Sequence, residues 1–207
     1  MPPRTPLLDP YAYFHDRYDS FLPGAVVFVA HVVVDLVLVF AVVWLLFQQI
    51  SNPPTGLWSQ LVSLLIGTAL LSLLIYLIAW LVVGALMHYL SGGSQTDGTL
   101  SDALGVAGWA YAPELLFALP TFAFAWNHIR SLTLDGSDPE RLVAELEAIE
   151  QLGLHPLEIV FLFVIVGWSV YILAKGTSAT HNVPIEKTVP PAAIVGLGSF
   201  VFTLLAL

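Results

Sequence analysis

Five long apolar segments fill most of this 207-residue chain and limit what it can fold into. A run of about 18 or more apolar residues with few charges is long enough to cross the ~30 Å hydrocarbon core of a bilayer. Helices of water-soluble proteins carry a polar outer face, which these segments lack. The sequence therefore predicts an all-α protein, a polytopic membrane bundle of five transmembrane helices. The predicted spans cover residues 24–50, 57–90, 102–127, 156–175 and 188–207.

The composition leaves little of the chain for a separate water-soluble domain. Only 10% of the residues are charged, whereas about 25% are charged in typical soluble domains. The longest polar stretch, residues 127–155, lies between the third and fourth predicted spans. We therefore expect two parts, an N-terminal arm over residues 1–22 and one membrane domain over residues 23–207.

The N-terminal arm is predicted to form a short helix at the membrane interface. Asp9 and Pro10 suit the cap and the first helical position, because aspartate accepts from free N–H groups and proline needs no partner there. Tyr11 and Phe14 follow at helical spacing. Aromatic side chains favour the headgroup depth of a bilayer, so the arm is expected to lie along the membrane surface.

A second helix outside the membrane, amphipathic in character, is predicted over residues 138–151. Leu142, Leu146 and Ile149 share one face of this helix, and acidic residues occupy the other face. Basic residues are almost absent from it, so docking on anionic lipid is not favoured. We expect the helix to pack on the membrane domain of the same chain.

The third predicted span contains Pro113 and Pro120. Each proline removes a backbone donor and clashes with the preceding turn, so this span is expected to be kinked or re-entrant. In lipid, such a break is tolerated only where protein groups or a polar cavity satisfy the freed carbonyls. Ser101 or Asp102 is expected to cap the beginning of the span.

The chain is acidic, with six Lys and Arg residues, fifteen Asp and Glu residues and a net charge of −9. Nucleic acids attract basic proteins, so no nucleic-acid partner is expected. An acidic surface poor in lysine suits high salt, where the Debye length falls to ~3 Å at 1 M. This balance predicts a halophilic source; the alternative is an ordinary acidic loop.

The few basic residues also predict how the chain is oriented, because cytoplasmic loops of membrane proteins are enriched in Lys and Arg. With the N-terminus in the cytoplasm, the inner loops hold Arg4, Arg17, Lys175 and Lys187, and the outer loops hold Arg130 and Arg141. We therefore expect an integral protein of the plasma membrane with a cytoplasmic N-terminus and a C-terminus outside.

Polar residues within the predicted spans form a candidate cluster of His31, Asp35, Tyr111 and Glu114. His31 and Asp35 are one helical turn apart and share a face. An aspartate in lipid costs at least ~2.5–3.5 kcal/mol on insertion scales, so it needs a partner. Glu114 follows Pro113 at the expected break, where polar cavities form in broken helices. The cluster could act as a proton relay or cation site, or could simply bond neighbouring helices to one another.

The sequence indicates no catalytic residue, no metal site and no cofactor. Cysteine is absent, which removes thiolate catalysis and cysteine-based metal sites. His88 and His181 are isolated and show no metal-ligand spacing. The glycine-rich stretch from Gly92 to Gly98 lacks the lysine and the preceding strand of a phosphate-binding loop.

Two motifs stand in a recognisable order along the chain. A Leu-Leu-Asp-Pro-x-x-Tyr-Phe-x-x-Arg run covers residues 7–17, and a glycine-containing loop and a Gly-aromatic-x-x-x-Pro stretch follow the second span. The chain resembles the Yip domain family (Ypt/Rab-interacting, YIPF-like five-span membrane proteins), in its prokaryotic and archaeal branch. The residues that carry the second motif are Gly92, Gly93, Gly108, Trp109, Tyr111 and Pro113. The resemblance implies five spans, a cytoplasmic N-terminus and no established reaction.

Two interpretations of the function follow. The first is a non-enzymatic integral membrane protein that acts through helix packing, membrane organisation or partner binding, with the lipid bilayer, a second copy or other membrane proteins as partners. Small residues such as Gly105 and Gly108 support close helix packing. The alternative is a small transporter or channel subunit that uses His31, Asp35 and Glu114.

Overall fold

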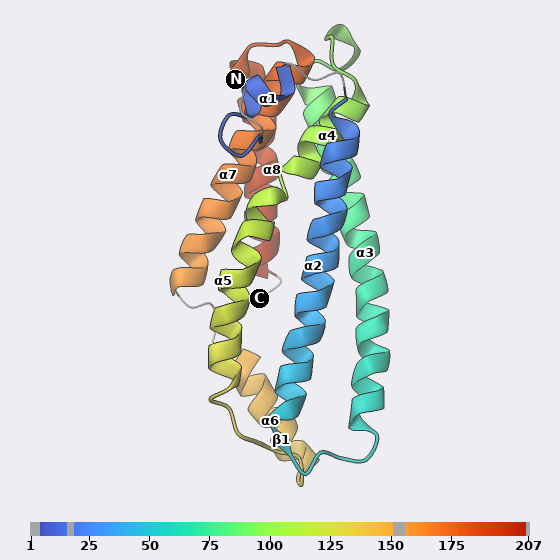
Figure 1. The fold of residues 1–207 in the computed structure, drawn as a ribbon, viewed down its shortest axis with the longest axis vertical. Coiled ribbons are helices and arrows are strands. Elements are labelled where there is room, and N and C mark those ends of the chain that lie inside the picture. Colours follow the sequence, from blue (N-terminus) through green and yellow to red (C-terminus); the bar gives the residue numbers. More distant parts are fainter. Residues whose placement is uncertain (1–4, 16–18, 151–155, 206–207) are drawn as a thin grey trace.

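The computed structural model describes residues 5–15, 19–150 and 156–205, and helices make up most of them. Four helices are long and apolar enough to cross a membrane. They are α2 (Phe21–Gln48), α3 (Leu57–Leu90), α7 (Pro156–His181) and α8 (Ile185–Leu205), and they run roughly along the long axis of the molecule (Figure 1). The predicted all-α membrane class is confirmed.

The predicted third span is divided between two shorter helices, α4 (Leu100–Trp109) and α5 (Ala112–Ile129). A fifth single helix of membrane length is therefore not found in the part of the chain that the structure describes. At the break, the Tyr111 N–H donates to the Gly108 carbonyl, 3.3 Å away, which tightens the last turn. Pro113 stands in the first turn of α5, where its missing N–H leaves no partner unsatisfied.

The cap of α4 is Thr99, not Ser101 or Asp102 as expected. Thr99 Oγ1 accepts from the Asp102 N–H (3.2 Å), and Asp102 Oδ2 accepts from the Thr99 N–H (3.0 Å), which is a capping box. The expectation was wrong because the helix begins at Leu100, which puts Asp102 in the third helical position. The other oxygen of Asp102 accepts from Ser20 Oγ (2.9 Å) and so ties α4 to the start of α2.

Helix α4 lies inside the upper end of the bundle, where small residues let it approach its neighbours closely (Figure 1). Ala103, Val106 and Ala107 are completely buried. A Cβ atom added to Gly24 of α2 would collide with the carbonyl of Gly105, and one added to Gly108 would collide with the carbonyl of Gly24. The α2–α4 crossing is therefore a backbone-to-backbone contact that only glycine permits at these positions.

The rest of the long helices presents apolar side chains outward. Leu64 and Leu70 of α3 and Leu197 of α8 are 67%, 65% and 66% exposed. Such apolar surface would be unstable in water, but it is the expected surface of a helix in contact with lipid tails. The bilayer, rather than a water-facing shell, is thus the solvent of these helices.

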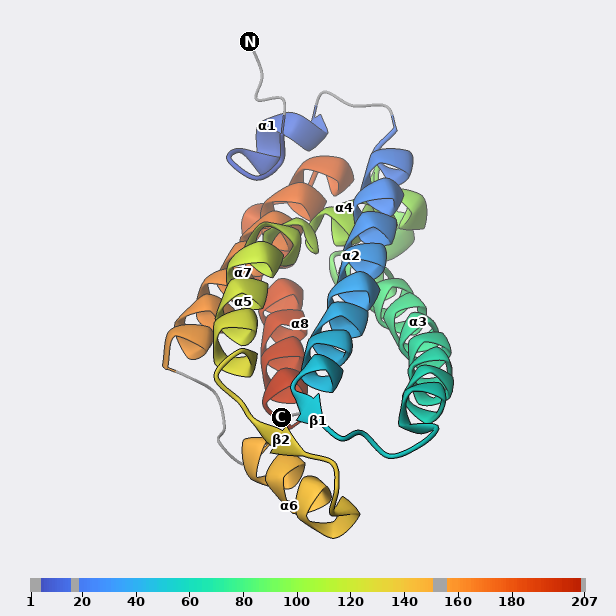
Figure 2. The same cartoon turned by 60° about the horizontal axis from the view of Figure 1, so that its bottom comes forward.

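Short elements close the two ends of the bundle. Helix α1 (Pro10–His15) lies across the upper end beside α7 (Figure 1). The 3₁₀ helix η1 (Gly93–Gln95) follows α3 in the chain and packs against it. At the lower end, β1 (Ile50–Ser51) pairs in parallel with β2 (Leu134–Asp135), and α6 (Pro139–Glu150) lies beside them (Figure 2).

The arm helix α1 is held against protein by specific contacts. Trp168 Nε1 of α7 donates to the Leu7 carbonyl at 2.8 Å. Phe14 is only 2% exposed, and its ring packs near Gly176, where a Cβ atom would meet it. The sequence predicted that Phe14 would face the headgroups. The structure instead turns this ring into the bundle and leaves Tyr11 at the surface.

Candidate functional site

The structure brings His31 of α2 and Glu114 of α5 into contact. His31 Nε2 lies 3.2 Å from Glu114 Oε2, although the two residues belong to different predicted spans. His31 is 6% exposed, and its Nε2 atom has no well-aligned hydrogen-bond partner among the described residues. The two atoms are therefore close enough for an ion pair but are not aligned for a hydrogen bond. The Nε2 atom can still form a hydrogen bond with another partner.

Asp35 finds its partner on α3. Tyr76 Oη donates to Asp35 Oδ2 at 2.8 Å, and the Tyr76 ring also contacts the His31 ring edge-on, with 5.4 Å between centroids. Sequence reasoning missed Tyr76. The signal that could have found it is chemical, because an aspartate in lipid needs a donor and α3 offers a phenol among aliphatic residues in its middle.

Tyr111 joins the same group from the break between α4 and α5. Its ring stacks on the His31 ring at 4.9 Å and meets Phe28 edge-on at 5.3 Å. All four candidate residues named from the sequence therefore meet around His31, together with Tyr76. We call His31, Asp35, Tyr76, Tyr111 and Glu114 the polar cluster.

The break in the third span explains why the polar cluster exists. Gly108 lets α4 touch α2, and the chain then turns at Tyr111 and restarts as α5. Pro113 and Glu114 stand in the first turn of α5, where Glu114 contacts His31 of α2. Ser169 Oγ of α7 donates to the Ala110 carbonyl at 2.6 Å, which satisfies an acceptor at the break.

A large pocket opens beside the polar cluster. Its volume is about 1090 Å³, and helices α2, α3, α5, α7 and α8 all contribute to its wall. Every member of the polar cluster lines it, and most of the remaining wall is aliphatic or aromatic, for example Leu38, Val42 and Phe202. The arrangement is a mostly apolar cavity with a few converging polar groups, as in sites that bind small molecules.

The other two motif glycines shape the turn after α3. Gly92 and Gly93 have φ angles of +123° and +54°, which L side chains rarely adopt. They let the chain reverse into η1 and on to the start of α4. Trp109, the aromatic residue of the motif, packs edge-on against Tyr13 of α1, with 5.6 Å between ring centroids.

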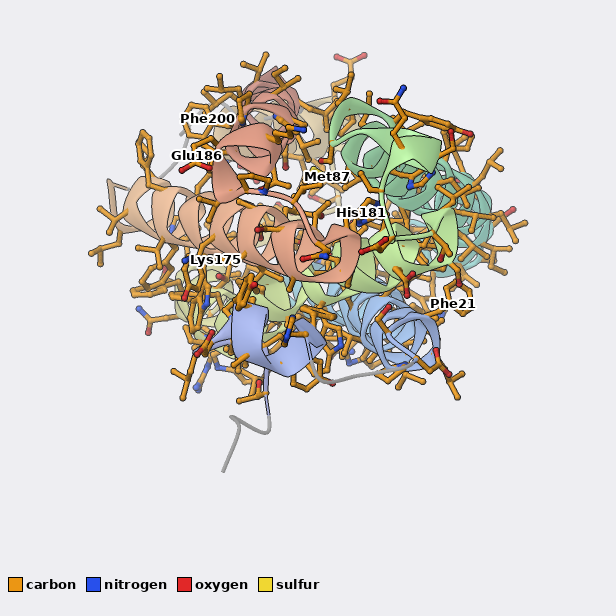
Figure 3. The ribbon with its side chains drawn as sticks, turned by 90° about the horizontal axis from the view of Figure 1, so that it is seen from above. Phe21, Met87, Lys175, His181, Glu186 and Phe200 are labelled. Carbon is orange, nitrogen blue, oxygen red and sulfur yellow. The ribbon has the colours of Figure 1, made fainter. Side chains whose placement is uncertain are left out.

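A second buried polar contact joins His88 and His181, which the sequence analysis treated as isolated. His88 Nδ1 at the end of α3 lies 3.0 Å from His181 Nε2 at the end of α7. His181 is 1% exposed and lies in the interior with Met87, whereas Phe21 lies at the rim (Figure 3). A Cβ atom on Gly98 would strike the His181 ring. In sequence the two histidines are far apart, and no spacing rule links them.

Within the residues that the structure places, no group of three or more His, Asp or Glu side chains is arranged to hold a metal ion. The His88–His181 contact brings together two imidazole groups. The polar cluster joins one imidazole, two carboxyl groups and two phenols. All five groups are able to donate or accept hydrogen bonds.

Comparison with known proteins identifies the family. Neither a curated protein nor a solved structure matches the chain. The family model for the Yip1 domain matches residues 6–207, which includes the arm, the glycine turn, the broken third span and the last helix. The chain therefore belongs to the Yip1 domain family of membrane proteins.

Proposed function

We propose that this Yip1-domain protein crosses the bilayer five times and acts without catalysis, by holding another component of the membrane in the pocket beside the polar cluster. The observation that carries the proposal is the pocket itself. The upper end of the bundle is packed at glycine contacts, whereas five helices leave about 1090 Å³ open in the part that faces lipid. A protein that served only as a packed anchor would have no need of such a space.

The fifth crossing in this proposal is made by α4 and α5 together. Helix α4 begins at the upper end, beside the last residues of α3, and α5 ends at the lower end, beside the strand pair (Figures 1 and 2). The 3₁₀-like turn at Tyr111 and the Ser169 contact satisfy backbone groups between them. A broken helix of this kind is compatible with lipid where protein surrounds the break.

The proposal places the upper end of the bundle in the cytoplasm, at the plasma membrane. Lys175 near the end of α7 and Lys187 near the start of α8 lie at that end, with helix α1. Arg130 and Arg141 lie at the opposite end, among acidic residues of α6 and the loop before it. Arg4 and Arg17 precede α2 in the sequence, so the side that holds the N-terminus has four bases and the other side has two, which supports a cytoplasmic N-terminus.

Filling the pocket tests the proposal. Gly198 lines the pocket, and an added Cβ atom there meets nothing within 4 Å, so Gly198→Phe would occupy the space without striking the backbone. Gly167 of α7 is equally open but does not line the pocket, so Gly167→Phe is the matched control. The wild type and both variants are extracted into nanodiscs directly from the membranes of the cells that produce them. Native mass spectrometry then gives the masses of the molecules that stay bound.

The proposal expects bound molecules on the wild type and on Gly167→Phe, and their loss from Gly198→Phe. An unchanged set of bound molecules on Gly198→Phe would refute it. Size-exclusion chromatography in detergent shows whether each variant keeps the oligomeric size of the wild type, which separates loss of a ligand from loss of assembly.

A second candidate function, a transporter or channel subunit, is favoured by one observation. His31 and Asp35 of α2 converge with Glu114 at the start of α5, and all three line the open pocket. Proton or sodium flux into liposomes, measured for the wild type, Asp35→Asn and Glu114→Gln, tests it. Flux that both substitutions abolish would support transport, and absent or unchanged flux would reject it.

A further inference from the structure

We propose that the pocket takes an uncharged lipophile, a molecule with a long hydrocarbon tail and a small oxygen-bearing head. This inference rests on the proposed function and names the chemical class of the occupant. The tail would lie against the apolar wall formed by residues such as Leu38, Val42 and Phe202. The head would lie at the polar cluster, which is the polar part of the wall.

The size of the pocket is that of a site for one small molecule. Pockets for small molecules commonly measure ~300–1,000 Å³. The pocket measures about 1090 Å³, at the upper end of this range. A single elongated molecule with one hydrocarbon chain therefore fits the space.

The depth of the polar cluster disfavours a charged headgroup. His31 comes ten residues after Phe21, the first residue of α2, and Gln48 is its last. At 1.5 Å per residue, His31 lies ~15 Å from one end of α2 and ~25 Å from the other. A phosphate or ammonium head at this depth would lose its hydration in the hydrocarbon core, which is costly. An uncharged head avoids that loss.

The polar atoms of the cluster match a carbonyl or hydroxyl head. His31 is 6% exposed and lines the pocket, and its Nε2 atom has no hydrogen-bond partner among the described residues. Glu114 Oε2 is 3.2 Å away and can accept from a hydroxyl. The Tyr76 hydroxyl is already committed to Asp35. Two carboxyl groups beside the site also disfavour a fatty-acid anion by charge.

Long-chain quinones and long-chain alcohols share this chemistry, and the experiment separates them. The purified full chain in detergent is offered a decyl-substituted benzoquinone, hexadecanol or hexadecanoate at neutral pH. Binding is measured by native mass spectrometry and by the shift of the thermal unfolding midpoint. A photoreactive group at the tail end of a bound probe should attach to residues of α2 or α8 that line the pocket.

We expect the quinone, the alcohol or both to bind, and hexadecanoate to bind at least tenfold more weakly. Gly198→Phe should abolish binding, Gly167→Phe should leave it unchanged, and His31→Leu should weaken it about tenfold. A smaller substitution, Gly198→Leu, should weaken binding if Gly198→Phe fails to fold.

Equal binding of hexadecanoate, or full binding to Gly198→Phe, would overturn the inference. Failure of every probe would also overturn it. The proposed function would survive that failure if molecules from the native membrane were still lost from Gly198→Phe and kept by Gly167→Phe.

Discussion

Glu114 Oε2 at the start of α5 lies 3.2 Å from His31 Nε2 in the middle of α2. The contact exists because the chain breaks at Tyr111 and restarts with Pro113 in the first turn, which turns Glu114 towards α2. The same break lets α4 press against α2 through glycines above the contact. The polar cluster and the close packing above it are thus two results of one local feature of the backbone.

The hydrogen bond from Tyr76 to Asp35 should couple α3 to α2 energetically. We expect Tyr76→Phe and Asp35→Leu, which remove the donor and the acceptor, to be non-additive, with a coupling of ~0.6 kcal/mol, the average for hydrogen bonds between membrane helices. Unfolding in mixed micelles by sodium dodecyl sulfate measures the four free energies. Tyr89→Phe is the control, because Tyr89 is 67% exposed at the end of α3. If Asp35→Leu coupled to Tyr89→Phe as strongly as to Tyr76→Phe, the assignment of this hydrogen bond would be contradicted.

Gly24 should tolerate no side chain. Its added methyl would collide with the Gly105 carbonyl, so Gly24→Ala must push α2 and α4 apart. Overpacking of this kind costs ~1–3 kcal/mol. Gly167→Ala, where the added atom meets nothing, should be neutral or slightly stabilising. The thermal midpoints of the two variants in detergent check this, and similar midpoints would show that the α2–α4 crossing is looser than described.

The His88–His181 pair should show the asymmetry of a buried hydrogen bond. His181→Leu removes one partner and leaves His88 Nδ1 buried without it, at a cost of ~1–3 kcal/mol. Replacing both histidines by leucine removes both polar groups, so the double variant should be more stable than either single variant. Chemical unfolding of the three variants measures this order. A double variant that is the least stable of the three would rule it out.

Asp135, the last residue of β2 before α6, should titrate below the usual range of an aspartate. Its carboxylate accepts hydrogen bonds from the backbone and side chain of Ser137, which lowers its pKa below 3.8. The bonds to the ionised form therefore stabilise the loop above the unfolded pKa, and this stabilisation is lost as pH falls through the folded pKa. Ser137→Ala keeps the backbone bond from residue 137 and the side-chain bond from Asn52, so carboxyl-carbon NMR should show a partial rise of the pKa. An unchanged pKa would exclude the side-chain bond.

The sequence was sufficient to predict the class of fold because apolar length alone determines which segments can cross a bilayer. Pro113 also marked the region of the break, since a missing N–H and a ring clash act locally. The family follows from motifs at Gly92, Gly108 and Pro113, and the family match over residues 6–207 confirms it.

Contacts between distant segments could not be predicted in the same way. Asp35 needed a donor, but nothing in the sequence placed Tyr76 opposite it rather than another polar residue. His88 and His181 are brought together only by the packing of α3, α4 and α7. Phe14 was expected at the headgroups because its spacing fits a surface helix equally well, and only the docking of α1 on α7 turns it inward.

Labelling of single cysteines from one side of the membrane tests the five crossings most directly. The chain has no cysteine, so Ser94→Cys before α4 and Ser137→Cys after α5 would each report alone. Both side chains are exposed. Ser94 belongs to η1, which follows the upper end of α3, and Ser137 stands between β2 and α6 at the lower end (Figures 1 and 2). In sealed vesicles of one orientation, a membrane-impermeant maleimide should label only one of the two variants, and detergent should make both reactive. Labelling of both from the same side would show that α4 and α5 do not cross the bilayer and would contradict the five-span arrangement.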